Sequence, residues 1–465
     1  MSAPDITTLG VLRASGHAPR TVREELRDNL LAKLRAGEDP WPGLHGLGET
    51  VLPQVERALI AGHDIVLLGE RGQGKTRLLR TLVGLLDEWT PVIAGSELGE
   101  DPLEPITVES RRRAAELGDD LPVAWRHRDE RYAEKLATPD TSVADLIGDV
   151  DPMKVAEGRS LGDPETIHFG LIPRSHRGIV AINELPDLAE RIQVAMLNVM
   201  EERDVQIRGY VLRLPLDVLV VASANPEDYT NRGRIITPLK DRFGAEIRTH
   251  YPVALEDEVA VIRQEAHLSA HVPDHLLEVL ARFTRALRES SSVDQRSGVS
   301  ARFAIAGAET IAAAARHRAT VQDEEAVARL VDVQTALDVL GGKVEFETGE
   351  EGREREILTH LLRTAIAETV RTHLRGVDFA RLVGAIEDGA TVSTGGRVTA
   401  REFLSGLPPL PPEGPGESDV YDEVCDRFAA TTDGERAAAI ELALEGLFLA
   451  RKVGKDSDGS ETVYG

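Results

Sequence analysis

The feature that most constrains the fold of this chain is a glycine-rich loop between a strand pattern and a helix pattern. Residues 69–76 read Gly-Glu-Arg-Gly-Gln-Gly-Lys-Thr, after the apolar run Ile65–Leu68 and before the helical pattern at 77–83. In a P-loop of this kind, backbone N–H groups surround a triphosphate, Lys75 reaches its β- and γ-oxygens, and the Thr76 hydroxyl faces Mg²⁺. The motif predicts an ATP-binding set formed by Gly69, Gly72, Gln73, Gly74, Lys75 and Thr76.

Length and charge narrow the class of protein. The 465 residues are 42% hydrophobic, which is enough for roughly two to four domains with real cores. Apolar runs are strand-length and residues 1–10 show no signal-peptide pattern, so we expect a cytoplasmic protein without membrane insertion. The net charge of −25 repels phosphate and disfavours dedicated nucleic acid binding. Cys425 is the only cysteine, which excludes an internal disulfide and a thiolate metal cluster.

Hydrophobic periodicity divides the chain into four parts. They are an N-terminal helical lead-in at 1–40, an α/β nucleotide-binding domain at 41–252, a helical lid domain at 253–345, and a mostly helical accessory region at 346–465 with a Pro-rich linker at 408–416. Within the second part, the polar stretch after Trp89 to about Arg131 has weak periodicity, so we expect irregular structure and short helices there.

Strand and helix patterns alternate downstream of the P-loop. Residues 178–182 are a continuous apolar strand pattern, and 188–203 carries apolar residues at helical intervals. A β-hairpin pattern at 205–214 and a second buried strand at 217–222 follow. Such alternation around a P-loop predicts a parallel sheet with helices on both faces, followed by an all-α lid and a mostly helical C-terminal extension.

Polar residues at the ends of two of these strands are candidates for ATP hydrolysis. Glu184 follows the strand at 178–182, where a carboxylate can polarise water beside the γ-phosphate. Asn225 follows the strand at 217–222 and could orient the attacking water. Asn183 can accept from a water bound to Mg²⁺ but carries no charge, so we expect a weaker electrostatic hold on Mg²⁺.

Several motifs in the same order and spacing resemble a known family. Together they closely resemble the ATPase subunit of magnesium chelatase and its MoxR-type relatives in the AAA+ superfamily. The motifs are Asp-Leu-Ile-Gly-Asp-Val-Asp-Pro at 145–152, Phe-Gly-Leu-Ile-Pro at 169–173, Arg-Gly-Ile-Val-Ala-Ile-Asn-Glu at 177–184, Ala-Ser-Ala-Asn-Pro-Glu at 222–227 and Leu-Lys-Asp-Arg-Phe-Gly at 239–244. The resemblance covers about residues 41–345, with a helix-2 insert at about 137–177 and a presensor-1 insert at 204–214.

The resemblance implies roles for residues of the nucleotide site. Residues 69–76 are similar to Walker A and 179–184 to Walker B, with Asn183 where the family usually has Asp. Asn225 is similar to sensor 1, and Arg302, which opens a helix of the lid, is similar to sensor 2. ATP and Mg²⁺ are the implied cofactors.

The resemblance also implies an assembly. Arg242 is similar to the arginine finger that reaches the ATP of a neighbouring subunit, and Arg232 and Arg234 are competing candidates for that role. A finger supplied by a neighbour makes hydrolysis depend on assembly, with an effect of roughly 10³–10⁵ in rate. Proteins of this clade form rings, commonly hexamers, and work with a partner that carries a von Willebrand factor A domain.

The favoured interpretation is a ring-forming, Mg²⁺-dependent ATPase that remodels a partner protein or drives metal insertion through one. One alternative is a nucleotide-gated scaffold, in which Asn183 leaves ATP bound and barely turned over. A sigma-factor-interacting transcription regulator is less favoured, because the sequence shows neither a Gly-Ala-Phe-Thr-Gly-Ala loop nor a basic helix-turn-helix. The sequence leaves open the remodelled substrate or metal, magnesium chelation itself, ring stoichiometry, hydrolysis rate and the role of 346–465.

Overall fold

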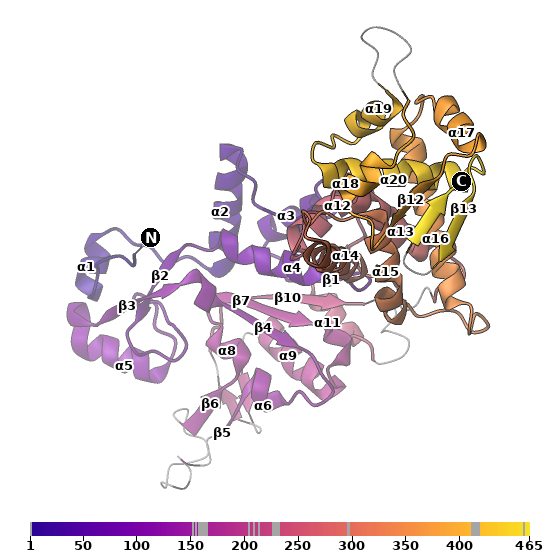
Figure 1. The fold of residues 1–465 in the computed structure, drawn as a ribbon. Coiled ribbons are helices and arrows are strands. Elements are labelled where there is room, and N and C mark those ends of the chain that lie inside the picture. The colour runs from indigo at the N-terminus through magenta and orange to yellow at the C-terminus, as the bar shows by residue number, and fades with distance from the viewer. Residues whose placement is uncertain are drawn as a thin grey trace. The chain divides into compact units, whose positions relative to one another are not determined.

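The chain folds into two units, Met1–Tyr251 and Pro252–Gly465, each with its own hydrophobic cores (Figure 1). The computed structural model describes residues 2–150, 153, 156, 166–202, 205–207, 210–212, 214–225, 233–294, 298–410, 419–458 and 461–465. Within these ranges no helix is both long enough and apolar enough to cross a membrane.

The first unit is built on a five-stranded parallel sheet with the order β11-β1-β10-β7-β4. The strands are β1 (Ile65–Leu68), β4 (Tyr132–Leu136), β7 (Gly178–Asn183), β10 (Val218–Ala224) and β11 (Ala245–Arg248). The three central strands, β1, β7 and β10, are buried along their whole length. A parallel strand buried on both faces needs a continuous apolar sequence, which explains the unbroken apolar runs of β1 and β7.

Helices cover both faces of this sheet. The side chains of Ile65, Leu67, Ile179 and Val221 form one core with α2 (Val22–Ala36), α3 (Leu52–Ile60) and α4 (Lys75–Thr81). Neighbouring residues of the same strands point to the opposite face, where they pack with α9 (Glu190–Glu202) and α11 (Thr237–Arg242). Figure 1 shows α2 and α4 on one side of the sheet and α9 on the other. The predicted fold class is therefore confirmed.

The stretch after Trp89 contains more strand than the sequence predicted. There β2 (Trp89–Ile93) and β3 (Val123–His127) form an antiparallel pair, with α5 (Val108–Leu117) between them. Ile93 and Val123 pack with Leu9 and Leu12 of α1 (Leu9–Ala14). The prediction of irregular structure and short helices was incomplete, because these strands are stabilised by contacts with residues about eighty or more positions away, which local periodicity does not report.

Two short ribbons lie in the regions predicted as inserts. The first pairs β5 (Gly148–Val150) with β6 (Ile167–Phe169), between the short helices α6 (Val143–Leu146) and α8 (Leu171–Arg174). The second pairs β8 (Val205–Ile207) with β9 (Tyr210–Leu212). The hairpin predicted at 205–214 is thus present in the part of that range that the structure describes.

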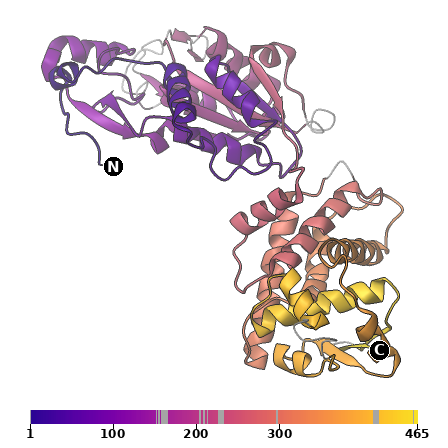
Figure 2. The same ribbon diagram turned by 90° about the horizontal axis from the view of Figure 1, so that it is seen from above.

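The second unit is mainly helical, with a small sheet at one edge (Figures 1 and 2). Its helices are α12 (Leu255–Glu265), α13 (Asp274–Glu289), α14 (Ala301–Gln322), α15 (Leu330–Leu340), α16 (Glu354–His373), α17 (Ala380–Glu387), α18 (Ala400–Ser405), α19 (Val420–Arg427) and α20 (Asp433–Leu449). The antiparallel sheet has the order β12-β14-β13, from Val392–Gly395, Glu461–Tyr464 and Lys455–Asp458. One core combines residues of α13 and α14 with Leu358, Leu362 and Leu442, so the ranges 253–345 and 346–465 share buried contacts.

A buried ion pair also joins those two ranges. Arg329, before α15, pairs with Glu441 in α20, and their side chains are 0% and 1% exposed. Arg329 further donates to the Val398 carbonyl at 2.7 Å and to the Thr394 hydroxyl at 3.1 Å. A buried guanidinium is tolerated only when its donors find acceptors, so α20 and β12 are fixed to the start of α15.

We expect Glu441→Gln to lower the free energy of unfolding by about 3 kcal/mol, because it leaves the Arg329 charge buried without a counter-charge. Urea unfolding followed by circular dichroism measures the effect. Glu423→Gln is the matched control, since its ion pair with Arg427 is 41% and 46% exposed, and we expect a change below about 0.5 kcal/mol. Equal losses for the two variants would contradict a structural role for the buried pair.

Candidate nucleotide-binding site

The P-loop lies between β1 and α4, and its glycines are required by the backbone. Gly72 and Gly74 both have φ of 79°, in the left-handed region that glycine adopts without strain. Gly69 is constrained by space instead. A Cβ atom there would lie 2.0 Å from the Thr249 hydroxyl oxygen and 2.2 Å from the Gln73 side-chain oxygen. A side chain at position 69 would therefore clash with Thr249 and Gln73 and displace the loop.

Side chains from the end of β11 hold the loop in place. The Gln73 side-chain oxygen accepts from the Glu70 backbone N–H at 3.1 Å and from the Thr249 hydroxyl at 2.8 Å. The Tyr251 hydroxyl donates to the Arg71 carbonyl at 2.7 Å. Gln73 was predicted as a nucleotide-binding residue from the motif alone, and in the structure its side chain serves to shape the loop.

Lys75 and Thr76 open α4 at the mouth of the loop. The Lys75 ammonium is buried and donates to the carbonyls of Gly69 at 2.6 Å and Glu70 at 2.7 Å. Its charge is thus held where the phosphates of a nucleotide would enter the cradle. The Thr76 hydroxyl donates to the side-chain oxygen of Asn183 at 3.3 Å, which joins the P-loop helix to the end of β7.

The carboxyl ends of β7 and β10 lie beside this helix. This was expected, because ligand sites of parallel sheets lie at the carboxyl ends of the strands. The Ser223 hydroxyl donates to the Asn183 side-chain oxygen at 3.0 Å, and the Glu184 backbone N–H donates to the Ser223 hydroxyl at 3.4 Å. Asn225 directly follows β10 and is buried. The structure therefore brings Thr76, Asn183 and Glu184 to one edge of the sheet.

Glu184 has an unusual backbone conformation. Its φ is 55° and its ψ is 48°, in the left-handed region that non-glycine residues rarely adopt. Such strain costs of order 1–3 kcal/mol and is concentrated at functional sites. Here it accompanies the turn of the chain that follows β7, at the edge of the sheet where the P-loop lies.

The sequence did not mark one further residue of this site, Glu134 on β4. Its carboxylate accepts from the Asn183 amide at 2.8 Å and forms two hydrogen bonds with the Arg80 guanidinium, at 2.7 and 2.9 Å. The hydrogen bonds from Arg80 lower the pKa of the Glu134 carboxyl, and burial raises the pKa of the neighbouring Tyr132 hydroxyl. Because β4 is half-exposed and short, it carries no apolar run that could have identified it as a strand of the main sheet.

Two of the predicted arginines, Arg242 and Arg302, belong to the helices α11 and α14. Arg242 is the last residue of α11 and forms an ion pair with Glu201 of α9, with the two side chains 43% and 38% exposed. Arg234 is exposed, and Arg232 lies outside the described residues. Arg302 is an exposed residue in the first turn of α14, in the second unit.

The donor atoms at this edge fit Mg²⁺ bound together with a nucleotide. A hydroxyl oxygen from Thr76, an amide oxygen from Asn183 and the nearby Glu184 carboxylate are hard oxygen donors. The described residues contain no group of three or more His, Cys, Asp or Glu that could hold a metal ion by itself. That combination suits Mg²⁺, which is usually held by few protein groups, several waters and the phosphates.

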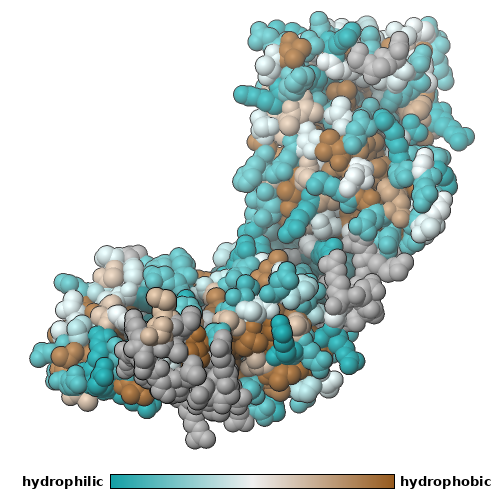
Figure 3. Space-filling model, turned by 90° about the horizontal axis from the view of Figure 1, so that it is seen from below, coloured by the Kyte–Doolittle hydropathy of each residue, from teal (hydrophilic) through white to brown (hydrophobic). Residues whose placement is uncertain are grey.

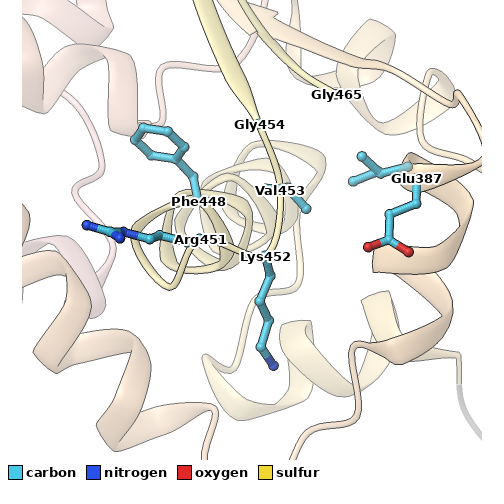
Figure 4. Close-up of a pocket in the computed structure, with 8 residues that line it drawn as sticks. Glu387, Phe448, Arg451, Lys452, Val453, Gly454 and Gly465 are labelled. Carbon is cyan, nitrogen blue, oxygen red and sulfur yellow. The ribbon is translucent and has the colours of Figure 1, made fainter.

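A pocket in the second unit lacks these features. It has a volume of about 360 Å³ and is lined by residues such as Glu387, Phe448, Arg451 and Lys452. Figure 4 shows Phe448 and Arg451 on one side of it and Glu387 on the other.

On the face seen in Figure 3 hydrophilic side chains predominate, and apolar ones occur in small scattered groups. The P-loop edge of the first unit therefore remains the candidate site.

Comparison with known proteins agrees with the geometry. This chain is 28% identical to the magnesium-chelatase subunit ChlI of Anabaena variabilis over 218 residues, which cover 46% of this chain and 60% of the relative. It is 27% identical over 215 residues, 45% of this chain and 47% of the relative, to the chloroplastic magnesium-chelatase subunit ChlI-1 of Arabidopsis thaliana. The matched part of this chain is therefore similar to AAA+ subunits of magnesium chelatase. The resemblance predicted from the motifs is thereby confirmed.

The match to these relatives is partial. The chain spans about half of their length, 47% to 60% in the two cases. No family model matches it. Among solved structures, it is similar to the complex of subunits BchI and BchD of magnesium chelatase, with a TM-score of 0.36, 19% identity, and coverage of 68% of this chain and 98% of that one. It is also similar to NtrX from Brucella abortus in complex with ADP, with a TM-score of 0.39, 13% identity, and coverage of 81% and 71%.

Proposed function

We propose that this AAA+ chain is a Mg²⁺-dependent ATPase that assembles into a hexameric ring and uses ATP to remodel a partner protein. The observation that carries the proposal is the meeting of Thr76, Asn183 and Glu184 beside the P-loop. It is the arrangement that ATP hydrolysis needs, with a phosphate cradle, oxygen donors facing the metal and a carboxylate at the adjacent strand end.

Each residue of the site has a distinct part in this proposal. Lys75 and the loop N–H groups bind the phosphates, and Thr76 and Asn183 face Mg²⁺, the latter through water. Bound Mg²⁺ supplies neutralising charge on the phosphate oxygens. Glu184 accepts a proton from the attacking water, and Asn225 orients that water.

The proposed assembly gives roles to Arg242 and Arg302. Arg242 acts on the ATP of a neighbouring subunit, and Arg302 acts as sensor 2 from the second unit. The relatives are named as subunits of magnesium chelatase, which supports a multi-subunit assembly here. The partner we propose carries a von Willebrand factor A domain, as the resemblance implies.

The test is ATP binding and hydrolysis by the full chain over a range of protein concentrations. We expect hydrolysis per chain to rise with concentration, because a neighbour completes the site, and to stop in EDTA. Lys75→Met should weaken nucleotide binding by at least about tenfold, since it removes the ammonium that faces the phosphates. No hydrolysis at any concentration, with or without a partner protein, would refute the ATPase proposal.

A nucleotide-gated scaffold is the second candidate, favoured by the neutral side chain of Asn183. If Mg²⁺ is held weakly, ATP remains bound and is barely hydrolysed. The scaffold and the enzyme differ in how they respond to the loss of Glu184, because only an enzyme has turnover to lose.

A further inference from the structure

Asn183 and Glu134 lie on adjacent parallel strands of the main sheet. Glu134 is paired with Ala181 and Leu136 with Asn183, so the two polar residues stand diagonally across the β4-β7 ladder. The Asn183 amide donates to a Glu134 oxygen at 2.8 Å. On its other side, the Asn183 oxygen accepts from the hydroxyls of Thr76 and Ser223.

This contact determines which way the Asn183 side chain points. The amide N–H₂ can donate to a carboxylate, whereas the amide oxygen placed there would face another acceptor and be repelled. Thr76 and Ser223 accommodate either end of the amide because hydroxyls both donate and accept. Glu134 therefore decides the orientation, and it directs the Asn183 oxygen toward the P-loop threonine.

Glu134 itself is held from the side of the P-loop helix. Arg80, one turn after Thr76 on α4, donates to both Glu134 oxygens, and the Tyr132 hydroxyl donates to one of them at 3.2 Å. The Arg80 side chain is 64% exposed and that of Glu134 is 22% exposed. The Glu134 carboxylate is thus fixed in place by Arg80 and Tyr132. The Arg80 guanidinium lies largely in water, which screens its charge, so it only partly offsets the negative charge of Glu134.

We infer that Glu134 is a positioning residue that orients the Asn183 side chain. Through its hydrogen bond with the Asn183 amide, Glu134 also supplies the negative charge that Asn183 lacks. A carboxylate that accepts from an amide polarises the amide oxygen and makes it a better acceptor for water on Mg²⁺. The inference rests on the proposed function and extends it. The Asn183–Glu134 pair, divided between two strands, replaces a single carboxylate at the end of β7.

The test measures the affinity of a fluorescent ADP analogue in EDTA and during a Mg²⁺ titration. For Glu134→Gln we expect the Mg²⁺ concentration at half-effect to rise by about tenfold, with the affinity in EDTA changed by less than about twofold. Arg80→Gln is the matched control, because it removes the charged partner of Glu134 and leaves the contacts with Tyr132 and Asn183. We expect its Mg²⁺ requirement to stay within about threefold of the wild type.

Inverting the pair sharpens the test. Asn183→Asp alone sets two carboxylates against each other, so we expect a melting temperature in EDTA lower by several degrees, about 4 °C. Adding Glu134→Gln again places an amide against a carboxylate, and both the melting temperature and the Mg²⁺ requirement should return close to wild type, within about threefold for the latter. A double variant that behaves like Glu134→Gln alone would overturn the inference, as would a Glu134→Gln protein with an unchanged Mg²⁺ requirement.

The outcomes separate this inference from the proposed function. Wild-type protein that binds the analogue equally well in EDTA and in Mg²⁺ refutes the role of Glu134 and leaves nucleotide binding intact. Wild-type protein that binds no nucleotide under either condition refutes the proposed function itself, and the inference with it.

Discussion

Arg242→Ala is expected to reduce ATP hydrolysis by roughly 10³–10⁵-fold in the assembled protein, with nucleotide affinity nearly unchanged. In the proposed role, the guanidinium stabilises charge that develops on the transferred phosphoryl group and contributes little to binding the ground state. Within its own chain Arg242 pairs with Glu201, and both side chains are about two-fifths exposed. Such an exposed ion pair contributes only about 0–1 kcal/mol to stability. Arg242 can therefore leave Glu201 and bind the phosphates of a nucleotide on a neighbouring subunit. Steady-state ATPase assays at concentrations that favour assembly measure the effect.

Two control variants test whether the loss belongs to Arg242. Glu201→Gln removes its intrachain partner and leaves the guanidinium, so we expect near-normal hydrolysis. Arg234→Ala tests a competing candidate, and a large loss there with normal activity in Arg242→Ala would reassign the finger.

Mixing experiments address action between subunits. Equimolar Arg242→Ala and Glu184→Gln proteins should regain activity, because about a quarter of the interfaces in a mixed ring then combine an intact Glu184 with an intact Arg242. Absence of any recovery would contradict a finger that acts on the neighbouring subunit.

The parts of this site that the sequence predicted are those carried by continuous apolar strands and by short local motifs. β1 and β7 are buried on both faces, so their composition alone indicates a central parallel strand. Once those strands are placed, Glu184 and Asn225 must lie at the carboxyl edge of the sheet. The P-loop is recognised from its local motif, in which Gly72 and Gly74 have the positive φ that glycine favours. The contact that requires glycine at position 69 involves Thr249 as well as Gln73, and the local motif does not report it.

Glu134 was missed for a physical reason. It lies on an edge strand whose residues are half-exposed, so burial imposes no alternation or apolar run on Tyr132–Leu136. β2 and β3 were missed because they are separated in the sequence by the helix α5, pair with each other, and pack on Leu9 and Leu12. In both cases the strand is selected by distant contacts, which outweigh a weak local preference.

Glu184→Gln is expected to lower the turnover number by roughly 10³-fold and to leave ATP bound, because the amide keeps the shape of the side chain but cannot accept a proton from water. The backbone strain at Glu184 is unaffected, since glutamine and glutamate have the same conformational preferences there. Single-turnover hydrolysis of labelled ATP, measured beside equilibrium ATP binding, separates the chemical step from binding. Glu190→Gln, at the start of α9, is the control for loss of a nearby surface charge and should hydrolyse ATP normally.

The same variant distinguishes the enzyme from the scaffold. In an enzyme the wild type turns over and Glu184→Gln does not, whereas in a scaffold both proteins bind ATP and neither shows appreciable turnover. If hydrolysis is required to release the partner, Glu184→Gln with ATP should retain partner proteins that the wild type releases, and exchange of ATP for ADP should free them. Retention that is equal with ATP and ADP would show that the nucleotide state does not control partner binding, and the remodelling part of the proposed function would then fail while the ATPase part stood.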